Sequence, residues 1–270
     1  MNLYIMTRGR IGNLLTPKSI PKSWRSKTYI VCPYSEHKQH QEDWPEFQVL
    51  IAPSSVTNYS EKFQFLIEWI DQYTGKGVIM DDDLWWDKQG VKENKDRCLV
   101  KLDSVEELDE MWQMMEEQLD CFPLVGVHPR MMGHQQPTPY KDVGKMVTVQ
   151  GINTRLFPTA PRMPKVDYDP ILADVHLVCW LLAHGCPNRI ITKYVVNWGP
   201  SQATGGCDYR TLDMQREACE RVAEMYGPHA KAVTKTPKTV KWLGDSRTDL
   251  RVQWKQLYKK APLKERNNAS

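Results

Sequence analysis

The chain has 270 residues, of which 41% are hydrophobic, and a formal net charge of +3. This length can form one large domain or two small ones around a sizeable core. No apolar run approaches the roughly 18 residues that a membrane span requires, so no membrane-embedded segment is expected. The seven cysteines are scattered and odd in number, which argues against a full disulfide framework and favours a reducing, cytoplasmic location.

Strand-like and helix-like segments alternate through the first half of the sequence. Apolar runs at 3–6, 28–34 and 47–53 are typical of strands, and a helix is expected to begin at Ser60. Further along, Ser104 and Glu107 form a capping box for a second helix, and two more strand-like runs follow at 124–127 and 146–152. This alternation predicts an α/β fold with a mostly parallel sheet flanked by helices. Ligands of such sheets bind beyond the carboxyl ends of the strands.

The most unusual stretch is GVIMDDDLWW, residues 77–86, where Asp81, Asp82 and Asp83 follow a strand-like run and precede two tryptophans. A solvated acidic turn is one interpretation. However, three carboxylates placed between buried segments oppose one another's ionisation through burial and repulsion. A divalent cation removes that conflict, because magnesium and manganese prefer hard oxygen ligands. We therefore expect a metal site at this strand end.

Arg8 and Arg10 follow the first predicted strand, so they are expected at the same edge of the sheet as the aspartates. Their forked guanidinium groups pair well with phosphates, although isolated surface arginines are common. Together with a divalent metal, the two arginines indicate a site for a pyrophosphate group.

The second half is expected to be more helical. Asp169 and Pro170 form a good helix start and Gly185 a good helix end, so the sequence predicts a helix over 170–184. Asp174 shares a face with the apolar positions of that helix, where it is either a general base or an aspartate favoured by the helix dipole. In the glycine-rich loop that follows, Gly205 and Gly206 form either a plain turn or a close approach of the backbone to a ligand.

Histidines and cysteines raise the question of a zinc site. The stretch HLVCWLLAHGC, residues 176–186, contains two of each, but its spacing matches no familiar zinc knuckle and its cysteines fit core positions. His128, His134 and His229 lie beside proline or glycine in expected loops. One of these three is a candidate to complete a metal shell, and ordinary surface positions are the alternative.

The basic residues are concentrated near the C-terminus. Residues 230–266 hold 11 Lys and Arg against 3 Asp and Glu, whereas the remainder holds 25 against 30. Ser246 and Asp249 are expected to cap a last helix, on which one basic stripe repeats every four residues, namely Arg247, Arg251, Lys255 and Lys259. The stripe indicates a polyanion, with a solvated face as the alternative. It is expected to lie apart from the phosphate site, on an extension of residues 234–270 beyond a domain of residues 1–233.

These motifs, taken in order, resemble a known family. Arg8-Gly9-Arg10 after the first strand, Asp81-Asp82-Asp83-Leu84 after the fourth, Asp174 in LADVHLVCWLLAHG and the loop GGCDYRT resemble the GT-A fold of nucleotide-sugar glycosyltransferases. The combination is most similar to the phage enzymes grouped with the TET-associated glycosyltransferases. The resemblance covers about residues 3–233, and its specificity lies in the order of the motifs, since the Asp-x-Asp element alone is short.

The resemblance implies a metal-dependent transfer of a sugar from a nucleotide sugar, such as a UDP-sugar, to a hydroxymethylated pyrimidine in phage DNA, protecting that DNA from restriction. It implies that Arg8 and Arg10 contact the diphosphate and that Asp81 and Asp83 hold Mn²⁺ or Mg²⁺, with Asp82 beside them. It further implies that Asp174 is the base. The donor and acceptor loop would be shaped by the residues of GGCDYRT, namely Gly205, Gly206 and Arg210.

Several alternatives stay open at this stage. Many members of the family have a Glu-Asp pair where this chain has Ala173-Asp174, which leaves inversion or retention at the anomeric carbon undecided. A glycosyltransferase of the same fold that acts on a protein or glycan is a second hypothesis, and a non-catalytic nucleic-acid-binding protein is a third. For the tryptophans Trp85, Trp86 and Trp198, stacking on an extruded base competes with ordinary core packing.

Overall fold

The computed structural model describes residues 1–91, 97–130, 138–158, 171–199, 209–236 and 246–260. Strands occupy β1 Asn2–Met6, β2 Thr28–Pro33, β3 Gln48–Ala52, β4 Lys76–Asp81, β5 Leu84–Val91, β6 Arg97–Lys101, β7 Leu124–Pro129, β8 Tyr140–Asp142, β9 Val149–Asn153, β10 Asn188–Trp198, β11 Ala230–Lys235 and β12 Arg247–Val252. Helices occupy η1 Thr16–Ser19, α1 Lys22–Arg25, η2 Tyr34–Glu36, α2 His37–Asp43, α3 Tyr59–Tyr73, α4 Val105–Gln118, η3 Thr154–Leu156, α6 Ala173–Ala183, α7 Leu212–Tyr226 and α8 Trp254–Lys259. Within these residues, no helix combines the length and the apolar character needed to cross a bilayer.

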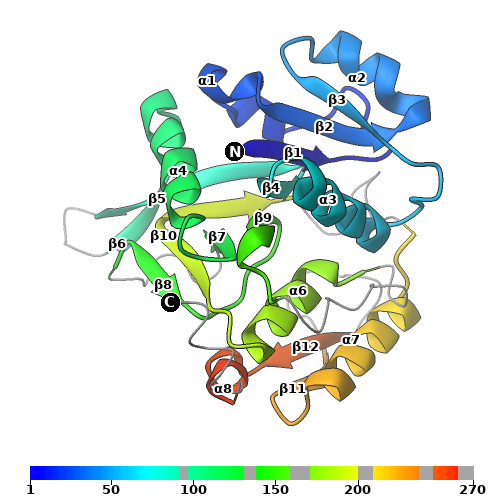
Figure 1. The fold of residues 1–270 in the computed structure, drawn as a ribbon, viewed down its shortest axis with the longest axis vertical. Helices are drawn as coiled ribbons and strands as arrows, with labels where there is room; N and C mark the ends of the chain where they lie inside the picture. The colour runs from blue at the N-terminus through cyan, green and yellow to red at the C-terminus, as the bar shows by residue number, and fades with distance from the viewer. Residues whose placement is uncertain (92–96, 131–137, 159–170, 200–208, 237–245, 261–270) are drawn as a thin grey trace.

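A large mixed sheet forms the centre of the molecule (Figure 1). Its strand order is β3-β2-β1-β4-β9-β7-β10-β5-β6, with β8 paired to β10. The strands β3, β2, β1 and β4 run parallel, and β10 runs parallel to β7. The strand β9 runs antiparallel to both β4 and β7, so the strand direction reverses beside the aspartates. The expected α/β class with a mostly parallel sheet is therefore confirmed.

Helices cover both faces of the sheet (Figure 1). Alternate residues of β1 point to opposite faces: Tyr4 packs with α3 and α6, whereas Leu3 and Ile5 pack with α1 and α4. Both sets are fully buried, as expected for strands covered on two sides. The apolar runs seen in the sequence are thus the central strands of a two-faced core.

Helix starts differ in detail from those predicted. Asn58, not Ser60, caps α3, because its side chain accepts from the Glu61 N–H and Glu61 returns a bond to the Asn58 backbone. Ser104 does cap α4, but the Glu107 carboxylate binds Lys88 instead of closing the box. Position 170 lies outside the described residues, and α6 is resolved from Ala173 to Ala183. Gly185 follows it with φ +78°, in agreement with the predicted helix end.

The C-terminal segment corrects one prediction. A helix beginning at Ser246 was expected, but residues Arg247–Val252 form β12, which pairs antiparallel with β11, and only Trp254–Lys259 are helical. The alternation of Thr248, Leu250 and Val252 is compatible with a strand. Pairing with β11 stabilises the strand more than the local sequence pattern stabilises a helix. The expected boundary between residues 233 and 234 falls within β11. The division into two parts stays a prediction.

Candidate active site

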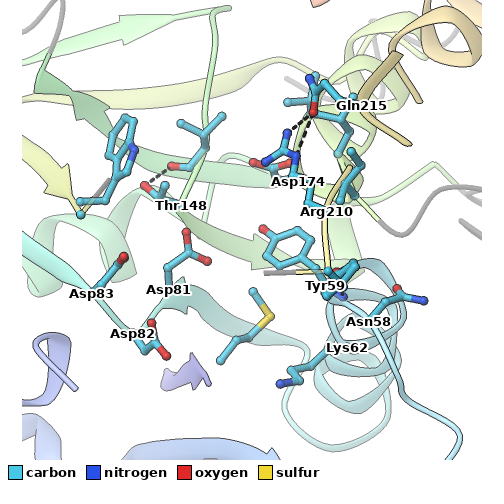
Figure 2. A pocket seen from close by; sticks show the side chains of 18 of the residues that line it. Asn58, Tyr59, Lys62, Asp81, Asp82, Asp83, Thr148, Asp174, Arg210 and Gln215 are labelled. Atoms are coloured by element: carbon cyan, nitrogen blue, oxygen red, sulfur yellow. Dashed lines mark hydrogen bonds between the residues drawn. The ribbon is translucent and has the colours of Figure 1, made fainter. Parts of the chain in front are cut away.

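A pocket of about 400 Å³ opens at the carboxyl ends of β1 and β4 (Figure 2). Residues from both ends of the chain line it. The first half contributes Arg8, Arg10, Lys62 and Asp81–Asp83. The second half contributes Lys145, Asp174, Arg210, Arg247 and Trp254. The sequence-predicted arginines and aspartates therefore do meet in one place, as parallel-sheet topology requires.

The turn that carries the three aspartates, called here the aspartate turn (Asp81–Asp83), is held by Thr16. Its hydroxyl donates to the Asp81 carbonyl at 2.8 Å and accepts from the Leu84 N–H at 2.9 Å. The N–H groups of Leu15 and Thr16 both donate to the Asp82 carbonyl. Because Thr16 is fully buried, these bonds fix the backbone from which the carboxylates project.

Arg10 binds two of the three carboxylates. Its Nη1 lies 2.7 Å from Asp82 Oδ1 and 3.0 Å from Asp83 Oδ2. Asp82 is only 5% exposed, and its burial raises the pKa to about 6 although Arg10 opposes the shift. In this structure Arg10 pairs with Asp82 and Asp83, which is a different contact from the diphosphate contact that the resemblance implies.

Asp81 differs from Asp82 in its electrostatic surroundings. Burial raises its pKa well above the ordinary value, and the carboxylates of Asp83, Asp174 and Asp82 raise it further. No described side chain donates a hydrogen bond to its carboxylate. A further positive charge beside Asp81 would favour its anionic form, and a bound divalent cation is one group that supplies such a charge.

The aspartate turn fits such a cation only in part. The described residues contain no cluster of three or more His, Cys, Asp or Glu side chains able to hold a metal ion. However, Mg²⁺ is commonly held by one or two carboxylates together with substrate phosphates and water. Asp81 and Asp83 match that pattern. His128, expected in a loop, is instead buried in β7, and His134 lies outside the described residues.

Asp174 lies on the wall formed by α6 (Figure 2). Its burial raises the pKa, while its backbone hydrogen bond and the charges of Lys145 and Arg210 lower it. The neighbouring Ala173 is fully buried in the core, so Asp174 is the acidic side chain that this helix start presents to the pocket. The residue before the helix, Leu172, has φ +69°. A left-handed non-glycine residue stores strain, which tends to occur at functional sites.

Basic groups line the remaining walls. Lys62 donates to the Thr7 carbonyl at 2.7 Å, and burial lowers its pKa. Arg8 donates to the Thr57 carbonyl. Arg210 Nε donates to Gln215 Oε1 at 2.9 Å, as Figure 2 shows. Gln215 in turn donates to the Thr248 carbonyl of β12, so this strand helps to place Arg210.

The C-terminal strand contributes directly to the pocket, contrary to expectation. Arg247 and Trp254 line it, and Arg247 Nε binds Asp249 Oδ1 at 3.0 Å. The predicted separation between the basic C-terminal residues and the phosphate site is therefore wrong. The predicted single stripe is wrong too, since Arg247 and Arg251 lie on β12 while Lys255 and Lys259 lie on α8. Whether these residues contact DNA stays a prediction.

The remaining predicted residues lie partly in the pocket and partly in the core. Gly205 and Gly206 lie outside the described residues. Trp198 lines the pocket, whereas Trp86 is 1% exposed and packs edge-on against Trp112 in the core. Cys179 and Cys186, from the stretch weighed as a zinc site, are both buried core residues. Trp198 can therefore stack on a ligand, whereas the buried Trp86 cannot.

Lys62, Lys145 and Gln215 were not found by sequence reasoning. The only available signal was for Lys62, which occupies the apolar face of α3 beside Phe63 and Leu66. A charged residue at such a position is unusual. Lys145 precedes a strand-like run and Gln215 lies near the start of a helix, where polar residues are common, so neither gave a signal.

Comparison with known proteins agrees with the site. The family model described as TET-Associated Glycosyltransferase matches residues 1–150, and the chain belongs to this family. It is a nucleotide-sugar-dependent glycosyltransferase. Two relatives, the beta-glucosyl-HMC-alpha-glucosyl-transferases of Enterobacteria phages T2 and T6, are each 26% identical over 202 residues, which is 67% of this chain and 67% of theirs. Among solved structures, mannose-1-phosphate geranyltransferase from Thermus thermophilus matches 84% of this chain and 80% of its own, with a TM-score of 0.37 and 11% identity.

Proposed function

We propose that this glycosyltransferase moves a sugar from a nucleotide sugar, with a UDP-sugar as the first donor to test, to hydroxymethylcytosine (HMC) in phage DNA. The observation that carries the proposal is the pocket in which the aspartate turn, basic residues and Asp174 meet. The names of the phage T2 and T6 relatives point to HMC as the acceptor base. The expected setting is the cytoplasm of an infected bacterium, where the modification would protect the DNA from restriction.

The diphosphate side of the donor belongs at the aspartate turn. Asp81 and Asp83 would hold Mn²⁺ or Mg²⁺, which when bound neutralises charge on the departing diphosphate. Arg8 and Lys62 line the same side of the pocket, and their positive charges suit phosphate oxygens. Arg10 keeps the turn in place by pairing with Asp82 and Asp83.

The acceptor side belongs at Asp174. In the transfer, the bond between the anomeric carbon and the phosphate oxygen breaks, and a new bond forms from that carbon to the acceptor hydroxyl oxygen. Asp174 receives the hydroxyl proton. A carboxylate with a raised pKa is a better base for this purpose than an ordinary one. The acceptor hydroxyl is either the hydroxymethyl group itself or a hydroxyl of a sugar already attached to it, as the names of the relatives suggest.

A base inside a duplex cannot reach a closed pocket, so the acceptor must be extruded or single-stranded. Trp198 at the pocket wall offers a surface on which such a base stacks. A non-catalytic DNA-binding protein has no need of the aspartate turn.

The decisive experiment incubates HMC-containing DNA, with and without a glucose already attached, with a panel of nucleotide sugars in Mn²⁺ or EDTA. Mass spectrometry of the digested nucleosides identifies any added sugar. A product that forms with Mn²⁺ and not with EDTA supports the proposal. Transfer only to glycans, or no turnover of any donor, would contradict it.

Two variants test the assigned roles. Asp83→Ala should reduce transfer to background because it removes a metal ligand, and Asp174→Asn should lower kcat by about 10²- to 10⁴-fold with little change in donor binding. Asp71→Asn, an exposed position on α3, is the matched control and should retain wild-type activity. An unchanged kcat in Asp174→Asn would assign this aspartate to the helix start alone.

A further inference from the structure

A second hollow adjoins the candidate active site. It has a volume of about 370 Å³ and is lined by the side chains of Lys141, Lys145, Trp254 and Lys255, among others. Lys145 and Trp254 also line the main pocket. The two spaces therefore share a wall, and the second one is called here the lysine hollow.

The lysine hollow is positively charged. Its three lysines come from β8, the segment before β9 and α8, and its described lining residues include no acidic one. Among the described parts of the chain, no ion pair neutralises any of the three. The nearest acidic residue in sequence, Asp142, is bound to Arg189 through Nε at 2.8 Å. The hollow thus carries a local surplus of positive charge that suits an anion.

The rim of the lysine hollow is rigid. The fully buried Asn188 side chain accepts from the Gly144 N–H at 3.1 Å and donates to the Gly144 carbonyl at 2.9 Å. The Val143 N–H donates to the Asn188 carbonyl. Val143 has φ +59°, which is costly for a β-branched residue and persists only where the surroundings enforce it. Lys141 and Lys145 flank this clamped segment, so the backbone positions from which their side chains project are fixed.

We propose that the lysine hollow holds the phosphodiester backbone of the acceptor DNA strand next to the target nucleotide. The inference rests on the proposed function, since it names where that acceptor lies. The donor phosphates belong beside Arg8 and the aspartate turn, which line the main pocket and not the hollow. A nucleotide leaving a strand in the hollow reaches the pocket by passing Trp254, a half-buried aromatic side chain on which a base stacks.

Two double variants with the same loss of charge test this placement. Lys141→Gln/Lys255→Gln removes two lysines that line the hollow and not the main pocket. Lys22→Gln/Lys27→Gln removes two exposed lysines in and after α1 that line neither space and do not belong to the basic stripe. Removing one phosphate contact should reduce the slope of log affinity against log salt by about 0.7 to 0.9.

The first variant is expected to raise the KM for an HMC oligonucleotide about tenfold and to lower the salt slope by about 1.5. Its KM for the donor and its transfer to an HMC mononucleotide, which has no flanking phosphodiester, should match wild type. The second variant should match wild type in every measurement. Equal salt slopes for wild type and the first variant, or a larger loss in the second, would overturn the inference.

The same assay separates the inference from the proposed function. If wild type modifies neither the oligonucleotide nor the mononucleotide, the proposed function fails. If wild type modifies both and the first variant behaves like wild type on the oligonucleotide, the proposed function stands and the hollow is not the strand site.

Discussion

His176 is a buried imidazole with a direct effect on acid stability. It is 5% exposed, its Nε2 has no hydrogen-bond partner among the described residues, and its ring packs against Tyr226. Burial lowers its pKa from 6.5 to about 4. The folded protein therefore holds this residue neutral at pH values where the unfolded chain is protonated.

Acid should therefore destabilise the folded protein through His176. As pH falls from 6.5 to 4, protons bind the unfolded chain first, so the free energy of unfolding decreases by up to about 3 kcal/mol through this group. His176→Phe should remove that part of the decrease. Urea unfolding of both proteins at pH 7, 6, 5 and 4 measures it. A variant whose stability falls with acid as steeply as that of wild type would show that His176 is not the cause.

Asp81 gives a prediction about metal and stability. In the absence of metal its ionised carboxylate is unfavourable, because burial and three other carboxylates oppose its charge. Asp81→Asn should therefore raise the melting temperature of the EDTA-treated protein by a few degrees, roughly the effect of 1 kcal/mol. The proposed metal site predicts that Mn²⁺ stabilises wild type and that this variant loses the stabilisation.

Thermal unfolding in EDTA and in Mn²⁺ tests this expectation without any activity measurement. Asp71→Asn serves again as the control and should respond to Mn²⁺ as wild type does. Equal stabilisation of Asp81→Asn and wild type by Mn²⁺ would place the metal elsewhere.

At the scale of elements, the aspartate turn depends on η1. The Thr16 side chain bonds both the strand before the turn and the strand after it. Thr16→Val keeps the shape but leaves the buried Leu84 N–H unsatisfied, which should cost about 2 kcal/mol of stability. Because the carboxylates lose their fixed backbone, Mn²⁺ affinity should fall as well.

Thr16→Ser is the matched variant, since it retains the hydroxyl and loses only a methyl group. Urea unfolding and calorimetric Mn²⁺ titration of the two variants separate the hydrogen bonds from packing. Equal Mn²⁺ affinity in both would mean that the turn holds its geometry without Thr16.

Some elements could be predicted from the sequence and others could not, for physical reasons. The strands before Arg8 and Asp81 were predictable because short, continuous apolar runs between turn residues are typical of buried strands. The strand β10 was missed, since Lys193 and Asn197 interrupt its pattern and its partners β7 and β5 lie far away in the sequence. The strand β12 was predicted as a helix because capping residues and a four-residue repeat are local signals, while its pairing with β11 is not.

The same distinction applies to the site. Asp81, Asp83 and Asp174 were predictable because carboxylates in apolar surroundings are costly and therefore informative. Lys145 and Trp254 became visible only when the fold brought them to the pocket. Their local sequence resembles any polar loop or helix start, so only the tertiary structure could identify them.

At the scale of the whole molecule, the pocket joins segments from opposite ends of the chain. Its walls run from Thr7 and Arg8 after β1 to Trp254 at the start of α8. Contacts of such large sequence separation form late in folding. The entropy cost of closing a long loop arises before the contacts that the loop makes can stabilise the fold. On the ribosome, the N-terminal strands emerge well before the residues that complete the pocket. An unfinished chain therefore carries the aspartate turn before α7, β12 and α8 are available to complete the walls of the pocket.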